Sequence, residues 1–213
     1  MVKLGWKSYS FVADIFGMTA FVLNLIGTMR CQFLQFTSVN GNLTRHFGLW
    51  WYGHYAFVTT GAQAWLYEGC FPYPDMIAMD SKWKAARAFD VIVLIGGLIY
   101  VFLGAVSACT PSGKVERPHA IVGVCLLLLC LFSGLTLLAL DSTLCKDNIL
   151  LGELGRIVFN DQCELSTGAN CFISATVFWF VAALCTLLAS RSKSDDEVEG
   201  GGTLEEPLIH EGP

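Results

Sequence analysis

Charged residues are scarce in this sequence, and they are unevenly spread. They make up 15% of the 213 residues, whereas a soluble domain usually has about a quarter of its residues charged. Several stretches carry almost no charge, and each is close to the roughly 20 residues that a helix needs to cross a bilayer. The composition therefore excludes an ordinary soluble domain and predicts a single membrane domain.

The sequence also lacks the patterns of common catalytic and nucleic-acid-binding sites. No C-x-x-C, G-x-S-x-G, H-E-x-x-H or phosphate-loop motif occurs, and no basic patch with interleaved aromatic residues indicates nucleic acid. Two histidines, His46 and His54, lie in one loop, but a metal ion would need further ligands there. We therefore expect no enzyme activity, no cofactor, no metal ion, no nucleic acid and no small-molecule substrate.

Four apolar segments predict four membrane-spanning helices. They lie at about residues 9–29, 89–109, 120–140 and 171–190. The first segment is too long for the apolar part of a signal peptide and is followed by no A-x-A cleavage site, so we expect it to be retained. The predicted fold class is all-α transmembrane, a four-helix bundle formed by residues 1–190.

Polar side chains are few within the predicted spans. Asp14 and Asn24 interrupt the first one, and we expect both to serve helix packing, because no second acid, histidine or arginine lies deep in another span to form a relay. Asp90 and Asp141 fall at span ends and are expected at the membrane surface. The glycines of the second span, Gly96, Gly97 and Gly104, favour close packing of helices.

The connections between the spans differ in length and indicate an orientation. Four spans place both termini and the short loop at 110–119 on one side, and the long loops at 30–88 and 141–170 on the other. Lysine and arginine lie close to the span ends on the side of the termini, which favours cytoplasmic termini. Asn42 begins an Asn-Leu-Thr glycosylation sequon in the first long loop, and such sequons are used only in a lumen.

The first long loop has the pattern of antiparallel strands. Residues 32–39 and 53–66 are rich in Thr, Phe, Tyr and Val, and Asn40-Gly41-Asn42 is a turn signal between them. We therefore expect a small antiparallel β-sheet, built from the loops, beside the four-helix bundle.

The motif order of this loop resembles the claudin and peripheral-myelin-protein superfamily. Gly48-Leu49-Trp50 is followed by Cys70, and an Ala-Arg-Ala stretch containing Arg87 leads into the second span. The layout of the superfamily is similar over about 190 residues. The resemblance implies that Trp50 anchors an outer sheet at the bilayer and that Arg87 caps the second helix against that sheet. The alternatives are an ordinary interfacial tryptophan and an ordinary arginine that extends to the interface.

The chain departs from the superfamily just after this motif. The superfamily usually has a cysteine three or four residues after the tryptophan, where this chain has Gly53 and His54. The resemblance therefore implies a divergent member in which another cysteine, Cys31, replaces it. Closing a loop of about forty residues adds about 3–4 kcal/mol of stability, although sequence alone leaves the connectivity open. The disulfide candidates are Cys31 with Cys70, and Cys145 with Cys163.

The cytoplasmic side carries two candidate modification sites. Residues 191–213 are polar, acidic and glycine-rich, so we expect a disordered tail in which Ser194, followed by three acidic residues, is a candidate for phosphorylation. Cys109 lies at the end of the second predicted span and is a candidate for palmitoylation.

These observations favour a claudin-like protein of the plasma membrane or an endomembrane. Its expected function is cell–cell or membrane contact and structural organisation through the outer loops. Its expected partners are the lipid bilayer and other membrane proteins, including copies of itself. The alternative is an auxiliary subunit of a channel, a transporter or another membrane protein complex. A small transporter or membrane enzyme is disfavoured, because the spans lack a polar pathway.

Overall fold

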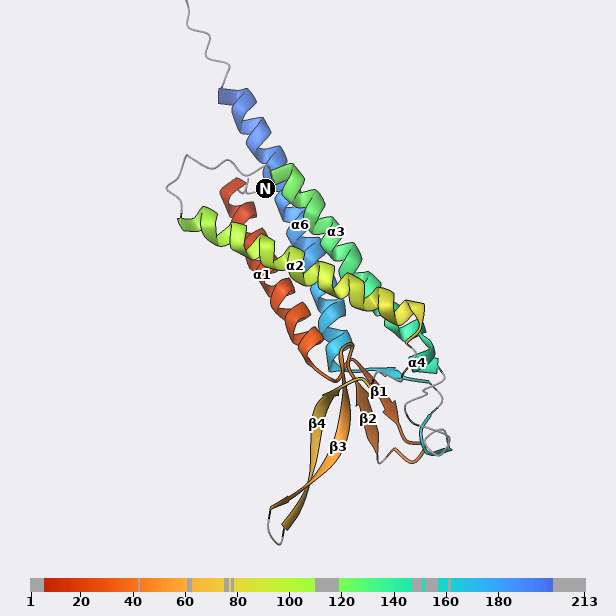
Figure 1. Cartoon of the computed structure of the whole chain (residues 1–213). Coiled ribbons are helices and arrows are strands. Elements are labelled where there is room, and N and C mark those ends of the chain that lie inside the picture. Colours follow the sequence, from red (N-terminus) through yellow and green to blue (C-terminus); the bar gives the residue numbers. More distant parts are fainter. Residues whose placement is uncertain are drawn as a thin grey trace, which may run out of the picture.

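The computed structural model describes the chain except for a few short segments and its two ends. The described residues are 6–41, 43–60, 63–74, 77, 79–109, 119–146, 151, 157–160 and 162–200. They form a four-helix bundle with a small antiparallel sheet at one end (Figure 1), which confirms the predicted fold class. We call the end with the sheet the outer end.

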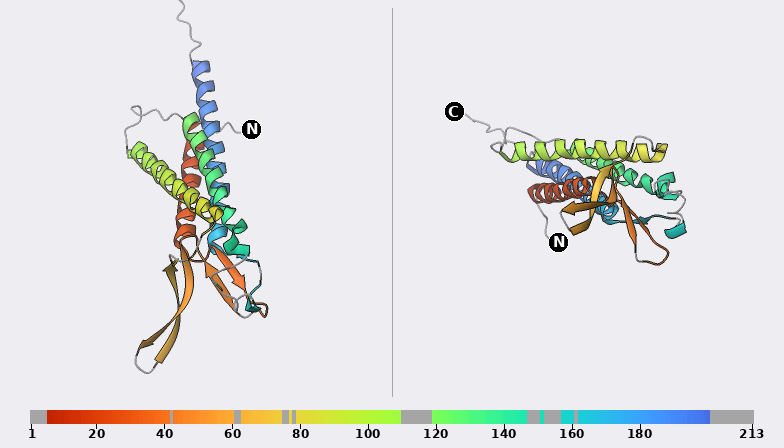
Figure 2. Two further views of the ribbon diagram at one scale, coloured as in Figure 1. Left: turned by 45° about the vertical axis from the view of Figure 1, so that its right-hand side comes forward. Right: turned by 60° about the horizontal axis from the view of Figure 1, so that its bottom comes forward.

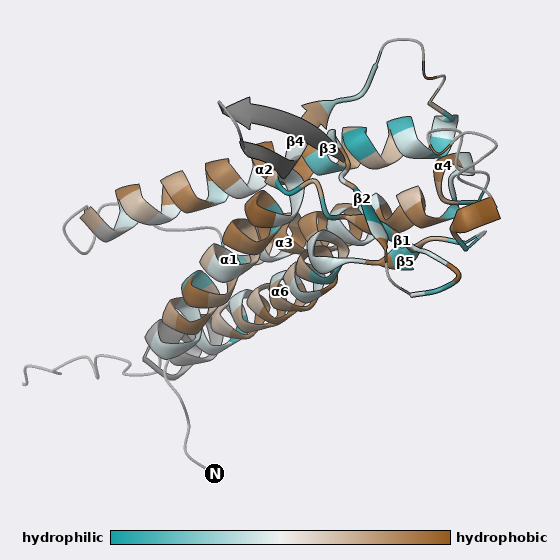
Figure 3. Cartoon of the chain, turned by 90° about the horizontal axis from the view of Figure 1, so that it is seen from below, coloured by the Kyte–Doolittle hydropathy of each residue, from teal (hydrophilic) through white to brown (hydrophobic). Residues whose placement is uncertain are grey.

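The bundle consists of four long helices, one of which continues as a 3-10 turn. They are α1 (Trp6–Met29), α2 (Ser81–Cys109), α3 (His119–Leu135) with η1 (Thr136–Asp141), and α6 (Thr167–Gly200). Each is long and apolar enough to cross a membrane, and hydrophobic residues lie along the outside of α1 and α2 (Figure 3). The chain is therefore an integral membrane protein, as its composition predicts.

Two helices extend beyond their predicted spans by eight or more residues at one end. The second begins at Ser81 rather than at residue 89, because Asp80 caps it well outside the apolar segment. The last helix continues to Gly200, which corrects the predicted disordered tail for its first ten residues. The stretch from Arg191 to Glu199 contains neither glycine nor proline, so nothing in it ends the helix. Residues 201–213 lie outside the described part of the chain.

The sheet has five antiparallel strands. They are β1 (Leu34–Thr37), β2 (Thr44–Phe47), β3 (Trp51–Thr60), β4 (Gln63–Pro72) and β5 (Glu164–Leu165). Their order is β4-β3-β2-β1-β5, so both long loops contribute. The predicted strand at 53–66 is in fact most of β3 together with the start of β4. These two strands form a long hairpin that projects away from the helices (Figure 2).

The sheet rests on the outer end of the bundle through a buried apolar core. Phe33 and Phe36 lie at β1, Trp83 lies in the first turn of α2, and Phe172 lies in α6; all four side chains are fully buried or nearly so. The Phe33 and Phe172 rings meet edge to face with centroids 5.5 Å apart, a favourable geometry for aromatic pairs. The sheet is thus packed directly on the ends of the membrane helices.

Glycines set the distance of closest approach between α2 and its neighbours. A Cβ on Gly96 would lie 2.6 Å from Leu129 Cδ2 of α3, and a Cβ on Gly97 would lie 2.6 Å from Phe21 Cδ2 of α1. Beyond this crossing α2 runs away from α3 (Figure 1), and no atom of the neighbouring described residues would lie within 4 Å of a Cβ on Gly104. The predicted packing role therefore applies to the first two glycines.

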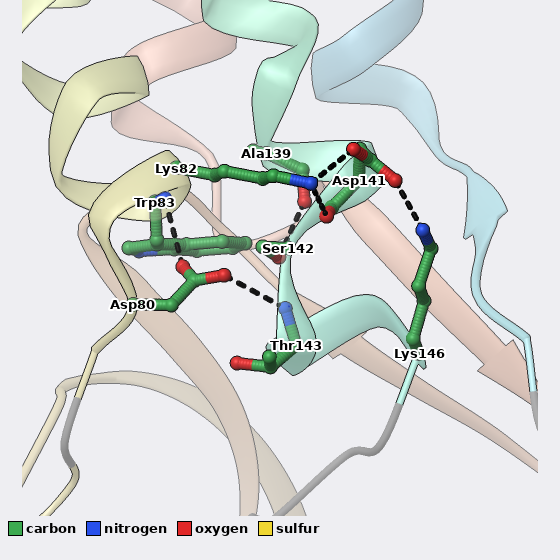
Figure 4. A network of polar contacts seen from close by, with 8 residues as sticks. All are labelled: Asp80, Lys82, Trp83, Ala139, Asp141, Ser142, Thr143 and Lys146. Carbon is green, nitrogen blue, oxygen red and sulfur yellow. Dashed lines mark hydrogen bonds and ion pairs between the residues drawn. The ribbon is translucent and has the colours of Figure 1, made fainter.

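Hydrogen bonds and ion pairs connect the outer end of α2 to the segment that follows α3 (Figure 4). Asp80 Oδ1 accepts the backbone N–H of Trp83 at 2.9 Å, and its Oδ2 accepts that of Thr143 at 2.9 Å. One carboxylate thus caps α2 and the short helix α4 (Thr143–Lys146) together. Lys82 and Lys146 both form ion pairs with Asp141, which is exposed at the span end as the sequence predicts.

Replacing Asp80 with alanine should lower the free energy of unfolding by about 1–2 kcal/mol, the usual value of a helix cap. Asp80→Asn, which keeps one acceptor oxygen, should lose less. Equilibrium unfolding in mixed detergent micelles measures both. The control is Lys84→Ala on the exposed side of the same turn, which should change the free energy little. Equal losses for Asp80→Ala and Lys84→Ala would contradict the capping role.

Candidate functional site: the outer sheet and its anchor

The tripeptide Gly48-Leu49-Trp50 joins β2 to β3, and polar groups from the β4–α2 segment bind each of its residues. Tyr73 Oη donates to the carbonyl oxygen of Gly48 at 2.7 Å. Arg87 Nε donates to the carbonyl oxygen of Leu49 at 2.8 Å. The indole Nε1–H of Trp50 donates to Asp90 Oδ2 at 2.7 Å. We call these six residues the anchor network.

The Arg87 side chain also contacts the two aromatic rings of the network. Its Cζ lies 4.9 Å from the centroid of the Trp50 ring and 5.3 Å from that of Tyr73, within the range of cation–π attraction. Burial raises the pKa of Tyr73, more than the nearby Arg87 charge lowers it, so the phenol stays protonated and can donate. Arg87 therefore contacts the connection between β2 and β3 and the residue that follows β4.

Asp90 lies beside Thr28, near the outer end of α1. Its side chain is fully buried inside the protein, which its position at a predicted span end did not reveal. Thr28 Oγ1 of α1 donates to Asp90 Oδ1 at 2.6 Å, and Trp50 donates to the other oxygen. A buried carboxylate needs such donors, and they come from parts of the chain that are distant in sequence. Asp90 therefore links the loop to two helices.

Gly48 lies where three pieces of backbone converge. A Cβ at this position would be 2.5 Å from the carbonyl oxygen of Arg30, 2.7 Å from Cys31 Cα and 2.7 Å from the carbonyl oxygen of Trp51. The Gly48 N–H also donates to the Trp51 carbonyl oxygen at 2.7 Å. The motif therefore needs glycine here because any side chain would meet backbone atoms.

Two disulfides hold the outer loops, in the pairs that the sequence analysis names as candidates. Cys31 is bonded to Cys70 with a Cα–Cα distance of 5.6 Å, and Cys145 is bonded to Cys163 at 5.1 Å. The first joins the end of α1 to β4, and the second closes the third loop. All of the other cysteines are free.

The polar residues of the first span contact neighbouring helices. Ser133 Oγ of α3 donates to Asn24 Oδ1 at 3.1 Å, and Thr176 Oγ1 of α6 lies 3.1 Å from Ser133 Oγ. Tyr100 Oη of α2 donates to Asp14 Oδ1 at 3.0 Å. These contacts fit the packing role that we expect for Asp14 and Asn24.

Of the three candidate modification sites, the structure describes the side chain of Cys109 and not those of Asn42 and Ser194. Asn42 lies outside the described residues, and so does the side chain of Ser194, whose backbone belongs to α6. Cys109 is the last residue of α2, and its thiol is free and exposed. All three remain predictions.

Large apolar side chains are exposed at and near the turn between β1 and β2. This turn is at the end of these strands that is farther from the helices (Figure 1). Val39 of this turn is 68% exposed, and Ile157 of the third loop is 77% exposed. Val39 N–H donates to the carbonyl oxygen of Val158 at 2.9 Å, which ties the two loops together. The outer patch, as we call it, consists of Val39, Leu43, Ile157 and Val158.

Sequence reasoning found the Gly-Leu-Trp motif, the cysteines and Arg87. It missed Tyr73 and Asp90, which bind the motif, and Thr28, which binds Asp90. The available signal was the acid at position 90, three residues after Arg87 and inside an apolar segment. Among the residues that the structure describes, no group of three or more His, Cys, Asp or Glu side chains could hold a metal ion.

The chain is a four-span membrane protein whose disulfide-bonded outer sheet is attached to its second helix. No protein-family model matches the chain, and no curated protein matches it.

Proposed function

We propose that the chain is a claudin-like membrane protein that acts in cell–cell or membrane contact and structural organisation through its outer loops. The observation that carries the proposal is the outer patch, in which both loops expose large apolar side chains near the end of the strands that is farther from the helices. Contiguous apolar patches outside a membrane commonly bind other proteins. The proposal assigns no catalytic role and no cofactor to the chain.

The outer patch is held in place by the rest of the structure, as a surface that binds other proteins requires. The patch belongs to a sheet that is packed on the bundle, bonded covalently to α1 through Cys31–Cys70 and joined to α2 by the anchor network. A surface that is held in one shape loses little conformational entropy when it binds. The proposal also places both termini in the cytoplasm and a glycan on Asn42, so that the outer loops face a lumen or the cell exterior.

The test is a clustering assay with vesicles that carry the purified protein with its outer loops facing outward. Val39→Asp combined with Ile157→Asp should lower the clustering seen by light scattering at least about tenfold, the effect of losing about 1.4 kcal/mol of binding free energy. Both side chains are exposed, so these changes should leave folding intact.

The matched control is Leu165→Asp, because Leu165 is also exposed in the sheet but lies outside the outer patch. This variant should cluster like the parent protein. Failure of the parent protein to cluster vesicles, or equal clustering by the double variant, would argue against the contact function.

The second candidate is an auxiliary subunit, and the inner end of α2 favours it. None of the side chains described between Val101 and Cys109 is buried. This segment offers a face to a helix of another membrane protein. Mild-detergent purification followed by mass spectrometry separates the two candidates: one large partner at fixed stoichiometry would favour the auxiliary role over the contact role.

A further inference from the structure

The apolar outer face of α1 ends next to the anchor network. Along this helix a row of large side chains is exposed, and its last member, Met29, is 68% exposed; the row comprises Phe11, Ile15, Met18, Val22, Ile26 and Met29. In a membrane-spanning helix such a row faces lipid. Met29 and the exposed Arg30 that follows it therefore mark where α1 leaves the hydrocarbon on the outer side.

Trp51 lies beside this helix end. The carbonyl oxygens of Arg30 and Trp51 would be 2.5 Å and 2.7 Å from the same point, the position of a Cβ on Gly48. Trp51 pairs with Pro72, and two positions along the hairpin Gly53 pairs with Cys70, which is bonded to Cys31 just after α1. The start of β3 is thus fixed at the level at which α1 ends.

The direction of the Trp51 side chain follows from the register. Side chains alternate across a strand, so Trp51 lies on the face of the hairpin that also carries Cys70, whose sulfur reaches the end of α1. Trp50, its neighbour, has its indole on Asp90 of α2. The two adjacent tryptophans therefore have different surroundings, and the Trp51 side chain is 42% exposed.

We propose that Trp51, Met29 and Arg30 form a lipid-binding corner that holds the outer sheet against the phospholipid headgroups. The occupant is lipid because this surface continues the lipid-facing row of α1. Tryptophan prefers the boundary between headgroups and acyl chains, and an arginine at a helix end can extend its guanidinium to the phosphates. This site stands independently of the proposed contact function, since it requires only that the chain spans a bilayer.

Photocrosslinking in lipid nanodiscs tests this corner. Trp51→p-benzoylphenylalanine should form covalent lipid adducts, detected by mass spectrometry, at a yield close to that of the same probe at Val22 in the lipid-facing row. The yield should exceed that of the probe at Val39, in the outer patch, at least about tenfold, the ratio that a preference of about 1.4 kcal/mol gives.

Formation of the Cys31–Cys70 disulfide, read by peptide mapping, verifies that each labelled variant is folded. A lipid yield at position 51 no higher than at position 39 would overturn the proposal. Adducts at position 51 to a protein chain in place of lipid would overturn it too, since they would make this surface a protein interface.

Discussion

Gly48→Ala is expected to lower the free energy of unfolding by at least about 3 kcal/mol, the upper part of the range for inserting a methyl group into packed surroundings. The added carbon would lie 2.5–2.7 Å from atoms of Arg30, Cys31 and Trp51. All of these are backbone atoms, so no side-chain rotation relieves the contact. Unfolding in mixed detergent micelles measures the loss, and incomplete Cys31–Cys70 pairing should accompany it.

Gly104→Ala is the control for this substitution. It introduces the same methyl group where the described part of the chain places no neighbouring atom within 4 Å, and alanine favours the helix over glycine by up to about 1 kcal/mol. We therefore expect no loss of stability. A Gly48→Ala protein as stable as the Gly104→Ala protein would show that β2 and β3 can be joined without this close approach.

Asp90→Ala is expected to lower the free energy of unfolding by about 3 kcal/mol, the upper end of the range for a donor left unpaired. The substitution leaves the indole N–H of Trp50 without its acceptor. The Thr28 hydroxyl loses its bond to the carboxylate and keeps only the carbonyl oxygen of Asn24 as an acceptor. The same micelle titration measures the change. Because the loop between β2 and β3 loses one of its bonds to α2, protease sensitivity of the outer loops should rise as well.

Two other aspartate variants serve as controls for Asp90→Ala. Asp90→Asn keeps one acceptor oxygen and should give an intermediate loss. Asp141→Asn should leave stability almost unchanged, because its ion pairs are exposed to solvent and solvent screens them. Equal effects at positions 90 and 141 would mean that the buried carboxylate has no special role.

The spans were predictable because a helix that crosses the bilayer needs apolar side chains along its whole length. About twenty apolar residues suffice to identify a span wherever the rest of the chain lies. The helix ends were less predictable. Ser81 begins α2 because Asp80 caps it, and that carboxylate also binds Thr143, from a loop 63 residues away.

The sheet was predictable in part. The turn around Gly41, whose φ is +72°, is a local feature that the sequence reveals. The border between β3 and β4 was missed because residues 53–66 read as one β-rich stretch. β5 has two residues and forms only through its pairing with β1, so no local pattern could reveal it.

The anchor network illustrates why site residues are harder to find than elements. Gly48, Leu49 and Trp50 were identified by resemblance, but their partners depend on distances across the fold. Asp90 looks like an interfacial acid when only its neighbours in sequence are considered. Its burial follows from two donors that lie 40 and 62 residues away along the chain.

A double-mutant cycle between Trp50→Phe and Asp90→Ala tests most directly whether the loop motif holds the sheet on α2. The two residues share a hydrogen bond of 2.7 Å, so we predict a coupling energy of at least about 1 kcal/mol in micelle unfolding. Losses that add to within about 0.5 kcal/mol would contradict the account, since independent sites behave in that way.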